Sequence, residues 1–412
     1  MENTVTAPPR AAPTLWQVLT AAPHRLLFLP GAVQIVAVLA WWLLELAARA
    51  GGFAPPAPRL PVVWTHSFLM IYGVFPFFIF GFLFTVYPRW LGGVPVARRA
   101  YVPAFLLLAS GQLLFYVALY APPVVAAVAL GLVIGGWIVA LAALLRVYAH
   151  ARQRGPHERL LNLALGAGVV GIGAFLGAVV TGPAWLFAVA REFGLWLFLV
   201  PVVFLVAHRM IPFFSQGTLM NYVVVRPAWA PPLMLVCVAA HAAFDLAGLE
   251  AWRFLADLPL AVAALHLSWA WQFRRSFHAR LLAMLHIAFL WLGIAMLLFT
   301  LQSLALLVTG SDPIGRAALH ALGIGFFTSM IVAMASRVML GHSGRMLAAD
   351  TLTWATLLGV NLAALLRIAG EWWPTGDWLN LLAGLVWLAA LTPWAVRHLP
   401  MVLKPRVDGQ PG

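Results

Sequence analysis

Polar side chains that are capable of chemistry mark both ends of one apolar stretch of the chain. His320 opens the stretch, Arg337 lies near its far end, and a Gly-His-Ser-Gly-Arg turn that contains His342 and Arg345 closes it. Lipid-embedded helices rarely carry such groups, because a charge at the centre of a bilayer costs about 2.5–3.5 kcal/mol on insertion scales. His320 and His342 are 22 residues apart, so a continuous helix separates them by ~33 Å. We therefore expect two sites, one at each end of this helix.

Histidine recurs in the other apolar runs. A neutral imidazole is the commonest metal ligand and a usual axial ligand of haem iron. His66 and His320 each begin a run that ends in an arginine, and we expect both about one helical turn below the same membrane surface. The histidines in or beside apolar runs are His66, His208, His241, His266, His286, His320 and His342. We expect the others in water or among lipid headgroups: His24, His150, His157, His278 and His398.

The arginines near the helix ends have two interpretations. Arg89, Arg209 and Arg337 can extend to lipid phosphates, as basic side chains at helix ends commonly do. Together with His208 and the turn at Arg345, they also supply imidazoles and guanidiniums on one side of the membrane. Such groups suit carboxylates, for example haem propionates, or an anionic headgroup.

The remaining polar residues of the runs are more ambiguous. His266 and His286 flank a short connection, and each alone fits a hydrogen bond between helices as well as metal ligation; for His241 the hydrogen bond is the favoured interpretation. Glu45 and Glu192 are the acidic residues within or beside the runs, and we expect neither in a chain of charges. Proton-coupled transporters usually need buried carboxylates, so this scarcity counts against that class.

The composition indicates which elements position these residues. Hydrophobic residues make up 63% of the chain and charged residues 9%, whereas soluble domains carry roughly 25% charged residues. A helix that crosses ~30 Å of hydrocarbon needs ~20 mostly apolar residues. The sequence thus predicts an all-α, polytopic membrane protein with twelve transmembrane helices. The predicted spans are residues 26–48, 63–87, 101–121, 123–148, 160–182, 186–208, 228–247, 251–272, 281–308, 317–340, 351–369 and 376–397.

The distribution of basic residues predicts the orientation. Of the 25 Lys and Arg residues, 19 fall on the side of the termini and 6 on the opposite side of the twelve predicted spans. This asymmetry follows the positive-inside rule and places both termini in the cytoplasm. The net charge of +13 is therefore a topology signal and does not point to nucleic acid. We predict a cytoplasmic lead-in (residues 1–25), a transmembrane domain (26–397) and a cytoplasmic tail (398–412).

The single cysteine restricts the chemistry further. Cys237 cannot form a disulfide within the chain, a four-cysteine metal site or a CxxCH haem attachment. A metal must therefore rely on histidine, methionine or oxygen ligands. Arg89, Arg209 and Arg337 are separated by 120 and 128 residues, which fits three repeated four-helix units and equally fits chance placement at helix ends.

Four motifs resemble the NnrS family of bacterial inner-membrane proteins. The most specific is the stretch from His320, especially RVMLGHSGR (Arg337–Arg345). The others are His66 with GFLFTVYPRW (Gly81–Trp90), HRMIPFF (His208–Phe214) and LLAMLHIAFLWLG (Leu281–Gly293). The resemblance implies a twelve-helix protein with haem and copper that is linked to nitric oxide metabolism and nitrosative stress. It extends to His66, His208, Arg209, His286, His320, Arg337, His342 and Arg345. Phe289 departs from the tyrosine expected there, which weakens a role in proton delivery.

A fainter resemblance is to haem–copper oxidases and nitric oxide reductases. His66 and His320 fall on the second and tenth predicted helices, which carry haem ligands in those enzymes. The tenth helix lacks a His-x-His motif and the seventh lacks a His-His pair, which argues against a copper centre of that type.

These observations lead to one preferred hypothesis. We expect a multi-pass protein of the bacterial inner membrane that binds haem b, binds nitric oxide and reduces it with electrons from a quinol. His66 and His320 are the predicted axial ligands, and Arg89, Arg209, Arg337 and Arg345 are predicted to contact the cofactor. His208, His286 and His342 would form a second metal site, for which copper is a candidate, or hold propionates. The alternative is a non-redox transporter or nitric oxide sensor.

Overall fold

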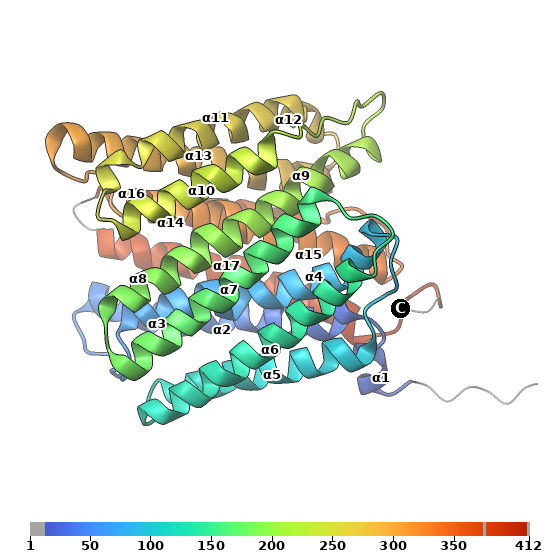
Figure 1. Ribbon diagram of the computed structural model, residues 1–412, viewed down its shortest axis with the longest axis horizontal. Coiled ribbons are helices and arrows are strands. Elements are labelled where there is room, and N and C mark those ends of the chain that lie inside the picture. Colours follow the sequence, from blue (N-terminus) through green and yellow to red (C-terminus); the bar gives the residue numbers. More distant parts are fainter. Residues whose placement is uncertain (1–12, 374–375, 410–412) are drawn as a thin grey trace, which may run out of the picture.

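The described part of the chain is a bundle of helices that run side by side (Figure 1). The computed structural model describes residues 13–373 and 376–409; residues 1–12 of the predicted lead-in and 410–412 of the predicted tail lie outside this part. The all-α prediction is confirmed. The helices are α1 Leu15–Leu19, α2 Pro23–Gly51, α3 Val62–Phe68, η1 Leu69–Val74, α4 Phe75–Trp90, α5 Arg98–Ala118, α6 Pro123–Ala149, α7 Pro156–Thr181, α8 Ala184–Glu192, η2 Phe193–Leu199, α9 Val200–Gln216, α10 Ala230–Leu246, η3 Glu250–Trp252, α11 Phe254–Ala270, α12 Phe273–Ser276, α13 Arg280–Thr309, α14 Ala317–His320, η4 Ala321–Thr328, α15 Ser329–His342, α16 Thr351–Ala369 and α17 Gly376–Leu403.

Several of these helices join into longer continuous rods, and ten rods are long and apolar enough to cross a membrane. They coincide with ten of the twelve predicted spans. The other two predicted spans correspond to α10 and α11, which have 17 residues each. A helix of that length extends ~25 Å, somewhat less than the ~30 Å of hydrocarbon. The chain is therefore a multi-pass membrane protein, while the seventh and eighth crossings and the orientation of the termini remain predictions.

Burial distinguishes the inner rods from the outer ones. The apolar 18-residue stretches of α14–α15, α3–α4, α13 and α8–α9 are 83%, 78%, 72% and 67% buried, whereas none of the other six rods exceeds 50%. These four rods carry His66, Glu192, His208, His286 and His320. These five polar residues thus lie on helices shielded from lipid by the rest of the bundle, whereas His241, His266 and Glu45 lie on other helices.

Three of the inner rods contain a π-helical segment at a similar place. The segments η1, η2 and η4 begin at residues 69, 193 and 321, which are 124 and 128 residues apart. His66, Glu192 and His320 come just before these segments. A π-helical turn holds an extra residue and often occurs at functional sites. The spacing favours the interpretation of three repeated four-helix units over chance.

Two of the π-helical segments are in direct contact through Tyr72 of η1. Its hydroxyl donates a 2.6 Å hydrogen bond to the Ala190 carbonyl, which lies just ahead of η2. Gly194 of η2 makes room for the ring, since an added Cβ would lie 2.6 Å from Tyr72 Cζ. The approach of the two rods thus depends on the missing side chain at this position.

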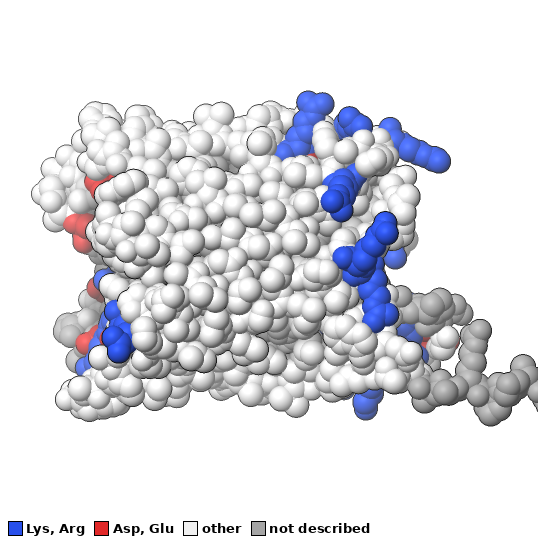
Figure 2. All heavy atoms as spheres, turned by 60° about the horizontal axis from the view of Figure 1, so that its bottom comes forward, with Lys and Arg blue, Asp and Glu red and all other residues white. Residues whose placement is uncertain are grey.

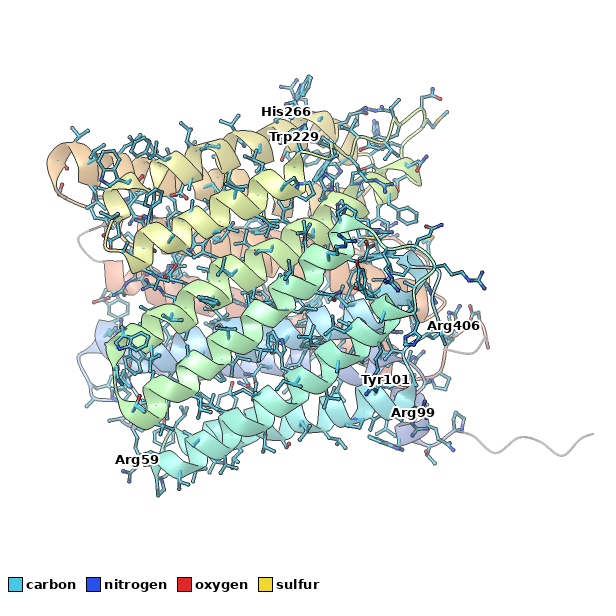
Figure 3. All side chains as sticks on the ribbon, in the orientation of Figure 1. Arg59, Arg99, Tyr101, Trp229, His266 and Arg406 are labelled. Carbon is cyan, nitrogen blue, oxygen red and sulfur yellow. The ribbon has the colours of Figure 1, made fainter. Side chains whose placement is uncertain are left out.

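Charge divides the bundle into two ends, as Figure 2 shows. Most Lys and Arg residues gather at one end, here called the basic end, where Arg99 and Arg406 lie, while Arg59 lies at the other end (Figure 3). Acidic side chains show at that other end, here called the acidic end (Figure 2). By the order of the helices, Asp245, Asp312 and Glu371 lie at or beside helix ends on this side. The six arginines that lie away from the basic end are Arg49, Arg59, Arg191, Arg253, Arg316 and Arg367.

Candidate functional site

His66 and His320 belong to one polar group at the acidic end, here called the His66–His320 cluster. The ring of His66 stacks on Trp42 of α2, with centroids 3.9 Å apart. His320 Nδ1 is 2.8 Å from the Arg316 carbonyl, and an N–H donated there leaves Nε2 with a free lone pair. Within the described residues, His66 Nδ1 is buried without a hydrogen-bond partner. Both imidazoles therefore retain a nitrogen that can bind a metal.

Three arginines complete this cluster. His66, His320, Arg316 and Arg367 lie close enough for their charges to affect one another, and Arg49 lies near His66 as well. Arg367 pairs with Glu371, whose Oε2 also accepts the Arg316 backbone N–H at 3.1 Å, and Arg49 pairs with Glu45 at 2.9 Å. The sequence-based prediction assigned no role to these guanidiniums. These three arginines are among the six that lie away from the basic end, and this exception to the charge asymmetry could have identified them from the sequence.

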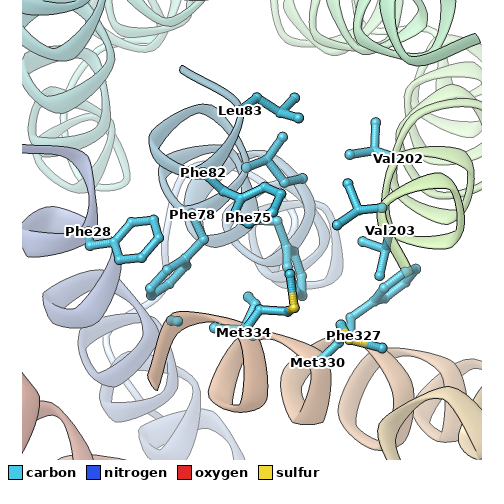
Figure 4. A pocket seen from close by; sticks show the side chains of 14 residues that line it. Phe28, Phe75, Phe78, Phe82, Leu83, Val202, Val203, Phe327, Met330 and Met334 are labelled. Atoms are coloured by element: carbon cyan, nitrogen blue, oxygen red, sulfur yellow. The ribbon is translucent and has the colours of Figure 1, made fainter. Parts of the chain in front are cut away.

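An apolar cavity of about 60 Å³ lies deeper in the bundle (Figure 4). It lies between α4, α9, η4 and α15, and its walls include Phe75, Phe78, Val202, Phe327 and Met330. Every lining side chain is apolar. A water molecule needs roughly 10–15 Å³ on the same measure, so the cavity accepts a diatomic molecule. Phe75 and Phe327 lie nine and seven residues after His66 and His320, so the cavity and the histidine cluster share the same two rods.

The three predicted histidines at the basic end each have a different partner. His208 Nδ1 is 3.0 Å from His157 Nε2, and His286 Nε2 is 3.1 Å from the Ser215 hydroxyl. The His342 ring lies 4.5 Å from the His24 ring, centroid to centroid. The structure thus distributes these histidines over three pairs.

Three of the histidines expected in water have other surroundings. His24 and His398 are each 1% exposed, and His157 contacts His208. For His24 and His398 the expectation was wrong because the start of α2 packs against the end of α17: the Arg25 side chain donates to the Val402 carbonyl at 3.4 Å and to the Lys404 carbonyl at 2.7 Å. His150 and His278 are exposed, as predicted.

The four predicted arginines lie at the basic end, away from the His66–His320 cluster. Arg209 pairs with Glu158, and Arg337 lies over the Phe214 ring at 3.8 Å. Arg89 is exposed and lies near His24 and His342. In the part of the chain that the structure describes, the buried Nη1 of Arg345 has no hydrogen-bond partner. Contact of these arginines with a cofactor remains a prediction.

A second polar group at the acidic end, here called the Glu192–His241 cluster, was not anticipated. Glu192 at the end of α8 meets His241 and Asp245 of α10, and one ligand atom from each lies within 4.8 Å of the other two. This buried trio can hold a metal ion. The expectation that Glu192 lies outside any chain of charges was wrong, because the packing of α8 on α10 brings together residues far apart in sequence.

Ion pairs extend this cluster toward the surface. Arg191 Nε is 2.7 Å from Glu192 Oε1, and Arg253 Nη1 is 2.9 Å from Asp245 Oδ1. Arg253 also donates to Gln302 at 3.2 Å, and Gln302 donates to Asp312 at 2.7 Å. Of the six arginines away from the basic end, five therefore belong to the two clusters.

Comparison with known families agrees with the motifs. A family model described as NnrS protein matches residues 18–406, which is most of the chain. A search of curated proteins gave no match.

Proposed function

The chain belongs to the NnrS family, whose association with the nitric oxide response is our premise, and we propose that it is a haem protein of the bacterial inner membrane that binds and reduces nitric oxide. The observation that carries this proposal is the His66–His320 cluster. It combines two imidazoles from different rods with three guanidiniums next to an apolar interior.

The residues of the cluster fit a haem b. His66 and His320 would hold the haem iron, because each has a ring nitrogen without a strong partner among the residues that the structure describes. Arg49, Arg316 and Arg367 would bind the propionates by charge-assisted hydrogen bonds. The Arg316 carbonyl would fix the His320 tautomer, as outer-shell acceptors commonly do for metal-binding histidines.

The apolar cavity supports nitric oxide as the substrate. Nitric oxide is small and nearly apolar, and the cavity offers it about 60 Å³ among Phe, Val and Met side chains. Reduction joins two nitric oxide molecules through an N–N bond and consumes two electrons and two protons to give nitrous oxide and water. The haem supplies the one-electron redox chemistry when bound. A membrane quinol is our proposed electron donor, since it would deliver electrons and protons from within the bilayer.

The test begins with the spectrum of the purified full-length protein. We expect a Soret band that shifts when nitric oxide is added to the reduced form, and loss of haem in His66→Ala and in His320→Ala. His278→Ala, which changes an exposed histidine, is the matched control and should retain the wild-type spectrum. A folded preparation without bound iron would refute the haem proposal.

A turnover assay separates the proposed enzyme from the alternatives. Wild-type protein in vesicles that contain a reduced quinone should consume nitric oxide and release nitrous oxide. If nitric oxide shifts the spectrum but is not consumed, the protein is a sensor or carrier and reduction is excluded. His320→Ala in the same vesicles gives the background rate.

A further inference from the structure

The Glu192–His241 cluster is separate from the haem site, and its geometry points to a resident metal. We propose that Glu192, His241 and Asp245 hold a divalent first-row transition-metal ion and that Asp257 orients His241 for this purpose. The proposal stands whether or not the chain binds haem, because none of these residues belongs to the His66–His320 cluster.

The ligand positions suit a single ion. His241 and Asp245 are four residues apart on α10, so both point to one face of the helix. His241 Nε2 is 3.7 Å from Asp245 Oδ2, and a ligand oxygen of Glu192 completes a group within 4.8 Å. Donors that share a tetrahedral ion with bonds of about 2.0–2.2 Å lie roughly 3.4 Å apart. Side-chain movements of less than an ångström or so would therefore close the site.

A carboxylate behind the imidazole prepares His241 as a ligand. His241 Nδ1 is 2.6 Å from Asp257 Oδ1, and Asp257 is fully buried. With the carboxylate accepting a hydrogen bond from the Nδ1–H, Nε2 carries the lone pair, and it lies on the side of Glu192 and Asp245. Metal-binding histidines almost always have such an acceptor on the other ring nitrogen, which fixes the tautomer and increases the basicity of the ligand.

The two ligating carboxylates are held in the same manner. Arg191 contacts Oε1 of Glu192, and Arg253 contacts Oδ1 of Asp245. One oxygen of each carboxylate is thereby fixed, and the second remains for the ion. Among the described residues, Glu192 Oε2 and His241 Nε2 are buried and lack a hydrogen-bond partner. Buried polar atoms are seldom left in this state, and a cation would satisfy both.

Charge and ligand chemistry define the class of ion. In their ionised forms, Glu192, Asp245 and Asp257 are three carboxylates faced by two guanidiniums, and a bound cation would balance the remaining negative charge. One imidazole and two carboxylates suit Zn²⁺, Fe²⁺, Mn²⁺ or Cu²⁺, whereas Cu⁺ prefers sulfur ligands. Three protein ligands leave a coordination position open, as in catalytic metal sites. Trp196 covers the His241 ring, with centroids 3.6 Å apart.

The experiment is a metal titration of the full-length protein. After treatment with a chelator, the wild type should bind one equivalent of Co²⁺, seen by its visible absorption, and Zn²⁺ should displace it. His241→Ala should weaken Co²⁺ binding by more than ~100-fold, and Asp257→Asn, which leaves all three ligands in place, by ~10–100-fold. His266→Ala, an exposed histidine on α11, is the control and should bind as the wild type does.

Two results would overturn the proposal: a wild type that binds neither ion, or a His241→Ala protein with wild-type affinity. If His241→Ala does not fold, Glu192→Gln takes its place. Glutamine has the size of glutamate, and Arg191 can still contact its amide oxygen. Unchanged Co²⁺ affinity in Glu192→Gln would equally contradict the site. The haem spectrum of Glu192→Gln should match the wild type, so failure of the metal site and failure of the haem proposal are distinguishable.

Discussion

Glu158 of α7 and Arg209 of α9 form an ion pair at the basic end of the bundle, and the Glu158 side chain is only 4% exposed. The Arg209 guanidinium also lies over the Trp90 ring, 4.5 Å from its centroid. With Trp90, this pair ties together the end of α4, the beginning of α7 and the second half of α9.

Removal of the acidic partner should destabilise the bundle. Glu158→Gln leaves the guanidinium without its counter-charge, and breaking a buried pair in this way costs about 3–5 kcal/mol. Because Arg209 is 26% exposed, we expect the free energy of unfolding to fall by an amount near the lower limit, on the order of 3 kcal/mol. The thermal midpoint in detergent measures it. Arg397→Gln breaks the exposed Asp350–Arg397 pair and should cost less than about 1 kcal/mol of stability. Equal losses of stability in the two variants would contradict the view that the Glu158–Arg209 pair is a buried, stabilising contact.

The arginines of the His66–His320 cluster should control haem retention. Arg367→Gln removes a charge-assisted hydrogen bond worth about 1.5–3 kcal/mol, which corresponds to roughly 10–100-fold in haem affinity. Haem transfer to apomyoglobin measures the loss. Arg59→Gln alters an exposed arginine at the same end and should leave haem transfer unchanged. If both variants release haem at the wild-type rate, the propionates are bound elsewhere.

Gly194 should tolerate no side chain. The Cβ of Gly194→Ala would meet Tyr72 Cζ at 2.6 Å and Ile71 Cγ2 at 2.8 Å, and such overpacking typically costs about 1–3 kcal/mol. The comparison is Gly173→Ala on α7, where an added Cβ meets no described atom within 4 Å. Helix propensity should make that change neutral or stabilising by up to ~1 kcal/mol. Similar unfolding midpoints for both variants would show that the rods can separate at no cost.

Asp350 should give the stability a dependence on pH. It precedes α16 outside the spanning helices, and hydrogen bonds from the Thr353 N–H (2.8 Å) and hydroxyl (2.7 Å) hold its pKa below the ordinary value, with help from Arg397. A lowered pKa stabilises the fold above the ordinary value of about 4, and this contribution disappears as the pH falls through the lower pKa of the folded state. Asp350→Ala should therefore cost ~1 kcal/mol at neutral pH and less in acid. Asp350→Asn, which can still cap the helix, should fall in between; a difference that does not change with pH would contradict this account.

The transmembrane helices could be predicted well from the sequence, whereas the contacts between neighbouring helices could not. Ten predicted spans match helices that are long enough to cross, because a run of apolar residues is a local property. His66 and His320 were paired by depth alone, and the structure brings them into one cluster. The location of Glu192 depends on which rods are neighbours, and no local pattern specifies that.

The solvent exposure of some histidines was the other property that could not be predicted from local sequence patterns. His24 comes before the predicted first span, so distance from a helix end indicated contact with water. Its burial results from the C-terminal end of α17 and the following residues, to which Arg25 is bonded across 377 and 379 positions of sequence. Contacts of this range become visible only in the folded chain.

The π-helical segments also indicate how such a chain can arise. Two rounds of tandem duplication of a four-helix ancestor would give three equivalent rods, α3–α4, α8–α9 and α14–α15, whose inner faces meet around the apolar cavity. The first and third copies along the chain have a histidine just before the π-helical segment, and the second copy has Glu192. Divergence at one inherited position would then account for the two different polar clusters, and each copy would have kept the same scaffold.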